Sequence, residues 1–115
     1  MDIHEHAADG IPVLELHGRL TLESFGQLKA RVRGIVDTGA RHLILDLAAV
    51  SYVDSIGVAE LVRSYVIFAN QSGRLVLASV PAHLTRLLRL TRLDQIVESS
   101  GSQEEAVHAL RDANV

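Results

Sequence analysis

The 115-residue chain has no cysteine and no tryptophan, and aromatic residues make up only 3% of it. Without cysteine it has no disulfide, no thiolate metal site and no cysteine nucleophile, a composition that suits a reducing cytoplasm. A basic surplus is also absent, because 14 acidic and 11 basic residues give a formal net charge of -3. Nucleic-acid binders usually carry excess positive charge to neutralise phosphates, so we expect no nucleic-acid partner.

Long apolar stretches are missing as well. No run approaches the roughly 20 apolar residues that a membrane span needs, and the acidic residues 1–5 do not resemble a signal peptide. Hydrophobic residues nevertheless make up 48% of the chain, enough to fill an aliphatic core. One domain commonly has about 100–150 residues. We therefore expect residues 1–115 to form one soluble cytoplasmic domain without a membrane span.

Hydrophobic periodicity and turn residues predict the secondary structure. The predicted strands cover residues 2–8, 11–17, 43–47, 75–78 and, as a short last strand, 93–97. The predicted helices cover about residues 22–38, 56–71, 81–91 and 102–112. Asp9-Gly10 predicts a hairpin turn, Gly18 is expected to end the second strand, and Ser102 with Glu105 forms a capping-box pattern.

The first helix is predicted from an apolar stripe that begins at Phe25, with Thr21 or Ser24 as its cap. Residues 43–47 are continuously apolar, which is typical of a strand buried on both faces of a parallel sheet. Strands that alternate with helices need crossover connections. The sequence therefore predicts an α/β fold with a mixed, mainly parallel sheet of four or five strands and about four helices.

The most informative segment places Asp54-Ser55 where a buried strand gives way to a helix. Both residue types are preferred helix caps. If Asp54 is the cap, the Ser55 hydroxyl faces solvent, and Gly57 leaves the backbone of the first turn open to close approach. A phosphate on Ser55 would lie at the positive end of the helix dipole, which favours it by about 0.3–1 kcal/mol per charge. On residue types alone, a simple helix cap is the favoured explanation of the pair, since capping serines are common.

This segment resembles the signature of STAS domains, the family of anti-sigma factor antagonists and of the cytoplasmic domains of sulfate transporters. The matching residues are Asp46-Leu47, Val50 and Val53-Asp54-Ser55-Ile56-Gly57-Val58. Residues 16–20 are similar to the family's strand-Gly-x-Leu junction, and residues 84–93 to its third helix and exit. The resemblance covers nearly the whole chain and implies a STAS-type fold.

The resemblance also implies a function. Ser55 corresponds to the serine that an anti-sigma factor kinase phosphorylates and a phosphatase restores. Unphosphorylated, the chain would bind the serine-kinase anti-sigma factor and free the sigma factor; phosphorylated, it would let go. It would be neither an enzyme nor a cofactor-binding protein. Ile56 stands where relatives commonly have a second hydroxyl, and Thr21 where many have an Asp. The partner-binding residues implied are Asp54, Ser55, Ile56, Gly57, Val58 and Leu61.

The alternative function is a constitutive interaction module of the transporter-associated, lipid-transport or stressosome-like kind, in which Ser55 is only a cap. A serine hydrolase needs Gly-x-Ser-x-Gly, but Val53 occupies the first glycine position. His4 and His6 are expected on one face of the first strand, whereas His17, His42, His83 and His108 are scattered. No His-x-x-x-His pair occurs, so the six are expected to be surface residues rather than metal ligands. Arg86, Arg89 and Arg92 are expected on a solvated helix face, with an acidic protein or a membrane surface as the alternative.

Overall fold

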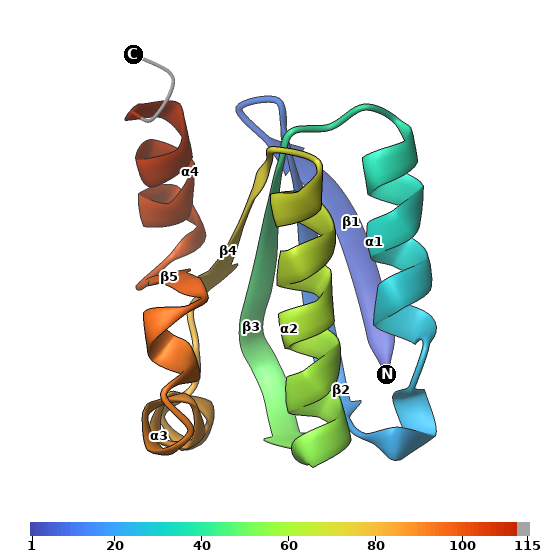
Figure 1. Cartoon of the computed structure of the whole chain (residues 1–115), viewed down its shortest axis with the longest axis vertical. Helices are drawn as coiled ribbons and strands as arrows, with labels where there is room; N and C mark the ends of the chain where they lie inside the picture. The colour runs from blue at the N-terminus through green and yellow to red at the C-terminus, as the bar shows by residue number, and fades with distance from the viewer. Residues whose placement is uncertain (113–115) are drawn as a thin grey trace.

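The structure is a computed structural model that describes residues 1–112 (Figure 1). Five strands form one mixed sheet in the order β1-β2-β3-β4-β5. β1 pairs antiparallel with β2, and the remaining neighbours pair in parallel. The strands are β1 (Asp2–Ala8), β2 (Ile11–Leu20), β3 (His42–Val53), β4 (Arg74–Ala78) and β5 (Glu98–Ser100). The α-helices are α1 (Gln27–Asp37), α2 (Ser55–Asn70), α3 (Ala82–Leu90) and α4 (Gln103–Asp112). These elements confirm the predicted mixed, mainly parallel α/β domain.

The two faces of the sheet carry cores of different size. In Figure 1, α1 and α2 run side by side across one face. The main core there joins buried side chains of β2, β3 and β4 to α1, α2 and α3, including Leu45, Leu61 and Leu84. On the opposite face a smaller core joins Ile44 and Val76 to α4, through Ala106, Val107 and Leu110. Because side chains alternate along a strand, neighbouring residues such as Ile44 and Leu45 serve opposite faces.

The prediction of one continuous helix over residues 22–38 was wrong. Leu22–Ser24 forms a short 3-10 turn, and α1 begins only at Gln27. Between them Gly26 adopts φ 92°, a left-handed conformation that interrupts the helical path. Phe25, predicted on the buried face, is 53% exposed as a result. The apolar spacing was right for Leu28, Val32 and Ile35, which are buried on α1.

Three strand boundaries also differ from the prediction. β2 does not end at Gly18. This residue adopts φ 111°, and the pairing of β2 with β3 continues to Leu20 through register shifts. β3 is not confined to residues 43–47 but continues to Val53. The last strand was predicted over residues 93–97, whereas Leu93–Gln95 forms a 3-10 turn and β5 follows at Glu98–Ser100.

The remaining helices agree closely with the prediction. α2 is displaced by one residue at each end, and the Ser102 hydroxyl accepts from the amide of Glu105 at the start of α4. Arg86 and Arg89 are exposed on α3, and Arg92 is exposed just beyond its end. Within residues 1–112, no helix is both long enough and apolar enough to cross a bilayer.

Candidate functional site

The site begins at the junction of β3 and α2, where Asp54 is the N-cap of α2. Its backbone is extended, with φ -96° and ψ -177°, and its Oδ1 accepts a 2.8 Å hydrogen bond from the amide of Gly57. This contact satisfies an amide of the first turn that has no carbonyl partner within the helix. The structure therefore confirms Asp54 as the cap, and the adjacent Ser55 is exposed to solvent.

Asp54 also holds the end of the neighbouring connection. Its second oxygen, Oδ2, accepts a 3.1 Å hydrogen bond from the amide of Leu22, which follows β2. The backbone amide of Gly57 is the main cause that lowers the pKa of Asp54, with the amides of Leu22 and Ile56 and the nearby Arg19 acting in the same direction. Hydrogen bonds to a carboxylate favour its charged form. Ser55 therefore lies next to a fixed negative charge at neutral pH.

Gly57 allows α2 to approach the end of β2 closely. A Cβ atom at this position would lie 2.1 Å from the carbonyl oxygen of Leu20 and 2.8 Å from its carbonyl carbon. A contact of that kind with backbone atoms cannot be relieved by rotating a side chain. The close approach expected at Gly57 is thus the packing of α2 against the end of β2, and it fixes the position of Ser55 relative to the end of that strand.

The predicted partner-binding residues divide into exposed and buried ones. Ser55 and Ile56 are exposed, and Asp54 is half-buried. Gly57, Val58 and Leu61 are buried, the last two as members of the main core. Val58 and Leu61 thus lie beneath the surface that a binding partner would contact.

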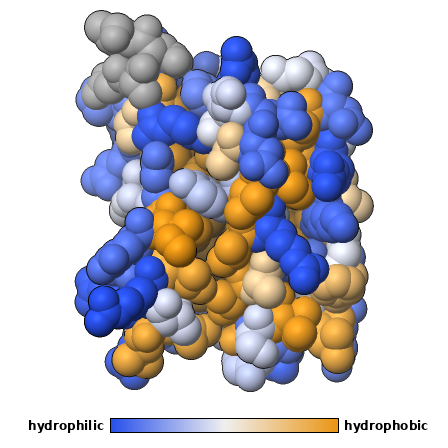
Figure 2. Space-filling view, viewed as in Figure 1, coloured by the Kyte–Doolittle hydropathy of each residue, from blue (hydrophilic) through white to orange (hydrophobic). Residues whose placement is uncertain are grey.

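The sequence did not indicate that large hydrophobic residues surround this helix start. Leu22 is 65% exposed and Tyr52 is 47% exposed, with the guanidinium of Arg19 4.7 Å from the centre of the Tyr52 ring. Phe25 and Ile56 add to this group. Figure 2 shows hydrophobic residues gathered over the lower part of the same face, where α2 begins. The only sequence signal for the exposure of Phe25 was Gly26, because this glycine separates Phe25 from the rest of the apolar stripe and interrupts the helix there.

Thr21 is occupied by the local turn. It is 7% exposed, and its Oγ1 accepts from the amide of Glu23 as the cap of the 3-10 turn. The Ser24 hydroxyl contacts both the amide and the carbonyl of Thr21. Thr21 and Ser24, both considered as caps of the first helix, thus cap this turn together.

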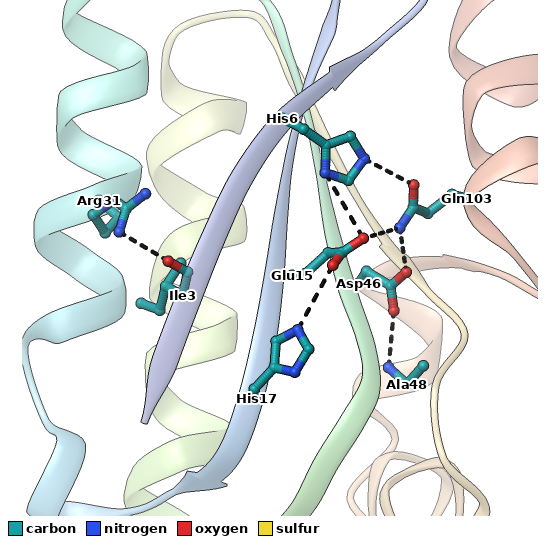
Figure 3. Close-up of polar contacts among 8 residues, drawn as sticks. All are labelled: Ile3, His6, Glu15, His17, Arg31, Asp46, Ala48 and Gln103. Carbon is teal, nitrogen blue, oxygen red and sulfur yellow. Dashed lines mark hydrogen bonds and ion pairs between the residues drawn. The ribbon is translucent and has the colours of Figure 1, made fainter.

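A second cluster of polar side chains lies on the face of the sheet that carries α4, where β1, β2 and β3 meet the start of this helix (Figure 3). Glu15 is central: it lies 3.7 Å from His6, 3.6 Å from His17 and 2.9 Å from the side-chain amide of Gln103. The same amide donates to Asp46. The hydrogen bond that Gln103 donates to Glu15 is the main cause that lowers the pKa of Glu15.

The histidines are therefore less scattered than the sequence indicated. The rings of His4 and His17 lie with their centroids 4.6 Å apart, and His6 shares Glu15 with His17. Antiparallel pairing of β1 with β2 brings these residues together, which spacing along the chain does not reveal. In the part of the chain that the structure describes, no three His, Asp or Glu residues are arranged to hold a metal ion. The group instead ties α4 to the sheet.

Comparison with known protein families decides the classification. Residues 3–98 match a family model described as "Mlab, STAS domain". The chain belongs to the STAS domain family. The matched residues run from the second residue of β1 to the first residue of β5, including the Asp54-Ser55 junction, and confirm the resemblance drawn from the sequence.

Individual relatives of this STAS domain point in the same direction. It is 27% identical over 105 residues to BtrV of Bordetella bronchiseptica, a protein assigned by name to the anti-sigma factor antagonists, and the match covers 91% of this chain and 90% of BtrV. An anti-sigma factor antagonist from Mycobacterium paratuberculosis superimposes with a TM-score of 0.85 at 22% identity, covering 96% of this chain and 93% of that one.

The Bacillus cell fate determinant SpoIIAA in its phosphorylated form has a TM-score of 0.71 at 18% identity, covering 94% of this STAS domain and 98% of SpoIIAA. At such identities the two structural matches establish a shared fold. What the protein binds has to be argued from its own surface.

Proposed function

We propose that this STAS domain is an anti-sigma factor antagonist whose partner binding is controlled by phosphorylation of Ser55. The observation that carries the proposal is the exposed Ser55 beside the capping carboxylate of Asp54. Because Asp54 supplies the cap, the serine hydroxyl has no structural duty at the helix start and is accessible to a kinase. The relatives assigned as anti-sigma factor antagonists support the class of partner.

The physical basis of the switch is a change of charge at a surface that is otherwise apolar. A phosphate adds about 1.5–2 negative charges next to Asp54. An apolar partner surface that covers Leu22, Phe25 and Ile56 would then have to remove water from this charge, and an acidic partner surface would be repelled by it. A coupling of about 1–3 kcal/mol, equivalent to roughly 5–150-fold in affinity, is sufficient for release.

The proposed cycle needs no catalysis by this chain. The unphosphorylated domain binds the serine-kinase anti-sigma factor and frees the sigma factor, the kinase phosphorylates Ser55, and a phosphatase restores the hydroxyl. All of these partners act in the cytoplasm, where a chain without cysteine suits the reducing conditions. The domain is then a phosphoprotein regulator of transcription that acts only through protein–protein contacts.

The experiment tests candidate serine-kinase anti-sigma factors chosen from the genes that neighbour the gene for this chain. Wild type, Ser55→Ala and Ser55→Glu are incubated with kinase and ATP, phosphate is located by mass spectrometry, and affinities are measured by calorimetry. We expect phosphate on Ser55 of the wild type, none on Ser55→Ala, and binding of Ser55→Glu weakened at least about 5-fold.

Ser99→Glu is the matched control, because Ser99 is exposed on β5 and receives the same charge away from α2. It is expected to bind like the wild type. Binding of Ser55→Glu at wild-type strength, together with a chain that no kinase modifies, would refute the switch and favour a constitutive interaction module of the transporter-associated or stressosome-like kind.

A further inference from the structure

The connection between β2 and α1 is held at both ends by carboxylates of α2. We call residues 22–26 the docking segment. Asp54 Oδ2 accepts from the amide of Leu22 at its start, at 3.1 Å. Glu60 Oε2 accepts from the amide of Gly26 at its end, at 3.0 Å, and from the amide of Lys29 at 3.3 Å. Two side chains of one helix thus fix the backbone from which Leu22 and Phe25 project into solvent.

Glu60 occupies an unusual environment for a carboxylate. It is only 2% exposed, and among the described residues none donates to its second oxygen, Oε1. Its hydrogen bonds are directed at the start of α1, where Gly26 is the N-cap and has no side chain with which to cap the helix. Glu60 therefore replaces the missing cap from a neighbouring helix, and its negative charge lies at the positive end of α1.

Stability alone does not explain this arrangement. A buried charge loses its hydration, and a well-packed apolar side chain of similar volume is often as stabilising as a buried polar contact. What an apolar side chain cannot do is accept two amide hydrogen bonds and so hold the left-handed turn at Gly26. The effect specific to Glu60 is the position of the docking segment.

We infer that Glu60 is a positioning residue that holds the docking segment so that Leu22 and Phe25, together with Ile56, form the surface on which the partner of Ser55 docks. Ile56 and Glu60 are four residues apart and therefore share one side of α2. This inference rests on the proposed function, since it concerns the same partner as the phosphorylation switch.

The charges around Ser55 indicate the chemistry of that partner surface. The half-buried Asp54 and the exposed Glu23 are acidic, and the guanidinium of Arg19 lies near Asp54, so both signs of charge surround the start of α2. A basic partner surface would be attracted more strongly by the phosphate and would not be released. Release on phosphorylation requires an apolar contact that becomes costly to desolvate, and the exposed Leu22, Phe25 and Ile56 provide one. The occupant of the docking segment is accordingly an apolar surface of the anti-sigma factor.

Two substitutions of similar volume separate positioning from stability. Glu60→Gln retains a side-chain oxygen that accepts from both amides, whereas Glu60→Met removes the acceptor. We expect Glu60→Met to remain folded by circular dichroism but to bind the anti-sigma factor kinase about 5- to 20-fold more weakly. Glu60→Gln is expected to stay within about 3-fold of wild type, because it preserves both hydrogen bonds.

Ser64→Ala is the control on the same helix, because Ser64 is 1% exposed and its hydroxyl donates to the backbone carbonyl of Glu60 without reaching the docking segment. It should bind like the wild type. Glu60→Met binding within twofold of wild type, or Glu60→Gln as weak as Glu60→Met, would overturn the inference.

Amide hydrogen exchange followed by nuclear magnetic resonance tests Glu60 without any partner. In Glu60→Met the amides of Gly26 and Lys29 should exchange at least about tenfold faster than in wild type, while amides in the middle of α2 keep their protection. Unchanged exchange at both amides would overturn the inference. If wild type itself fails to bind the kinase, the proposed function fails, and the exchange result still decides whether Glu60 positions the docking segment.

Discussion

The two faces of the sheet are held in different ways. On the face covered by α1, α2 and α3, a large aliphatic core sets the positions of the helices, and hydrogen bonds of the half-buried Asp54 and the buried Glu60 refine the connection beside Ser55. On the other face, α4 rests on a small core and is tied down by partly exposed polar groups such as Glu15 and Gln103. The family model matches residues 3–98 and so ends before α4. The large core supports Ser55, the proposed phosphorylation site, whereas α4 is an attachment to the reverse side of the same sheet.

Neighbouring residues of β3 test this difference most strongly. Leu45 and Ile44 are both 0% exposed, but Leu45 lies in the main core and Ile44 in the smaller one. We expect Leu45→Ala to lower the free energy of unfolding by about 3–5 kcal/mol and Ile44→Ala by about 2–3 kcal/mol, because the thin α4 layer can collapse into the space left. Urea unfolding followed by circular dichroism measures both values.

Hydrogen exchange adds the location of each effect. Ile44→Ala should accelerate exchange mainly in α4, whereas Leu45→Ala should affect α1 and α2. Equal losses of stability with the same exchange pattern would show that the two faces form one undivided unit.

Two glycines sharpen the description of the main face. Gly57→Ala places a Cβ against the Leu20 carbonyl, and we expect a loss of about 1–3 kcal/mol because backbone must move. Gly34→Ala, on the exposed side of α1, meets nothing within 4 Å and is expected to stabilise the protein by about 0.5–1 kcal/mol. Thermal unfolding of both variants checks the pair, and a Gly57→Ala variant as stable as wild type would contradict the close approach of α2 to β2.

The smallest effect is expected at the polar attachment of α4. Gln103→Ala removes the donor that lowers the pKa of Glu15, and should cost about 0.5–1 kcal/mol at neutral pH. A carboxyl with a depressed pKa in the fold contributes stability above its ordinary pKa and loses it as the pH falls through the folded value. The difference between wild type and Gln103→Ala should therefore be full above the ordinary pKa of Glu15 and should shrink as the pH falls through its lowered value in the fold.

Urea unfolding between pH 7 and pH 3 measures that difference. Glu104→Ala, an exposed residue of the same helix turn, serves as the control and should show no such closure. A gap between wild type and Gln103→Ala that is constant with pH would mean that Glu15 does not respond to Gln103.

Local sequence patterns were sufficient for the elements that one dominant signal determines. The apolar run at residues 43–47 gave the buried first half of β3, and the cap at Asp54 gave the bounds of α2 to within one residue, because burial and capping act on consecutive residues. The docking segment was missed for the opposite reason. Its shape depends on Glu60, more than thirty residues later in the chain, and no local pattern records that contact. The sequence predicted a shared strand face for His4 and His6 but not the approach of His17 and Glu15, because only the pairing of β1 with β2 brings them together.

The exposure of Ser55 could be predicted, but its surroundings could not. Placing Asp54 as the cap implied that the next hydroxyl was available, and Ser55 is exposed in the structure. The apolar residues beside it include Phe25, whose helical spacing had assigned it to the core. Helical periodicity predicts the burial of a residue correctly only within one continuous helix, and Gly26 separates Phe25 from α1.

One titration tests the central claim most directly. Wild-type protein is phosphorylated to completion by the anti-sigma factor kinase that the proposed function requires, Ser55 is verified as the modified residue, and the Kd for the kinase is compared with that of the unmodified protein at one salt concentration. We expect the phosphorylated form to bind about 5- to 150-fold more weakly. Equal Kd values for the two forms would contradict a charge-controlled docking surface at the start of α2.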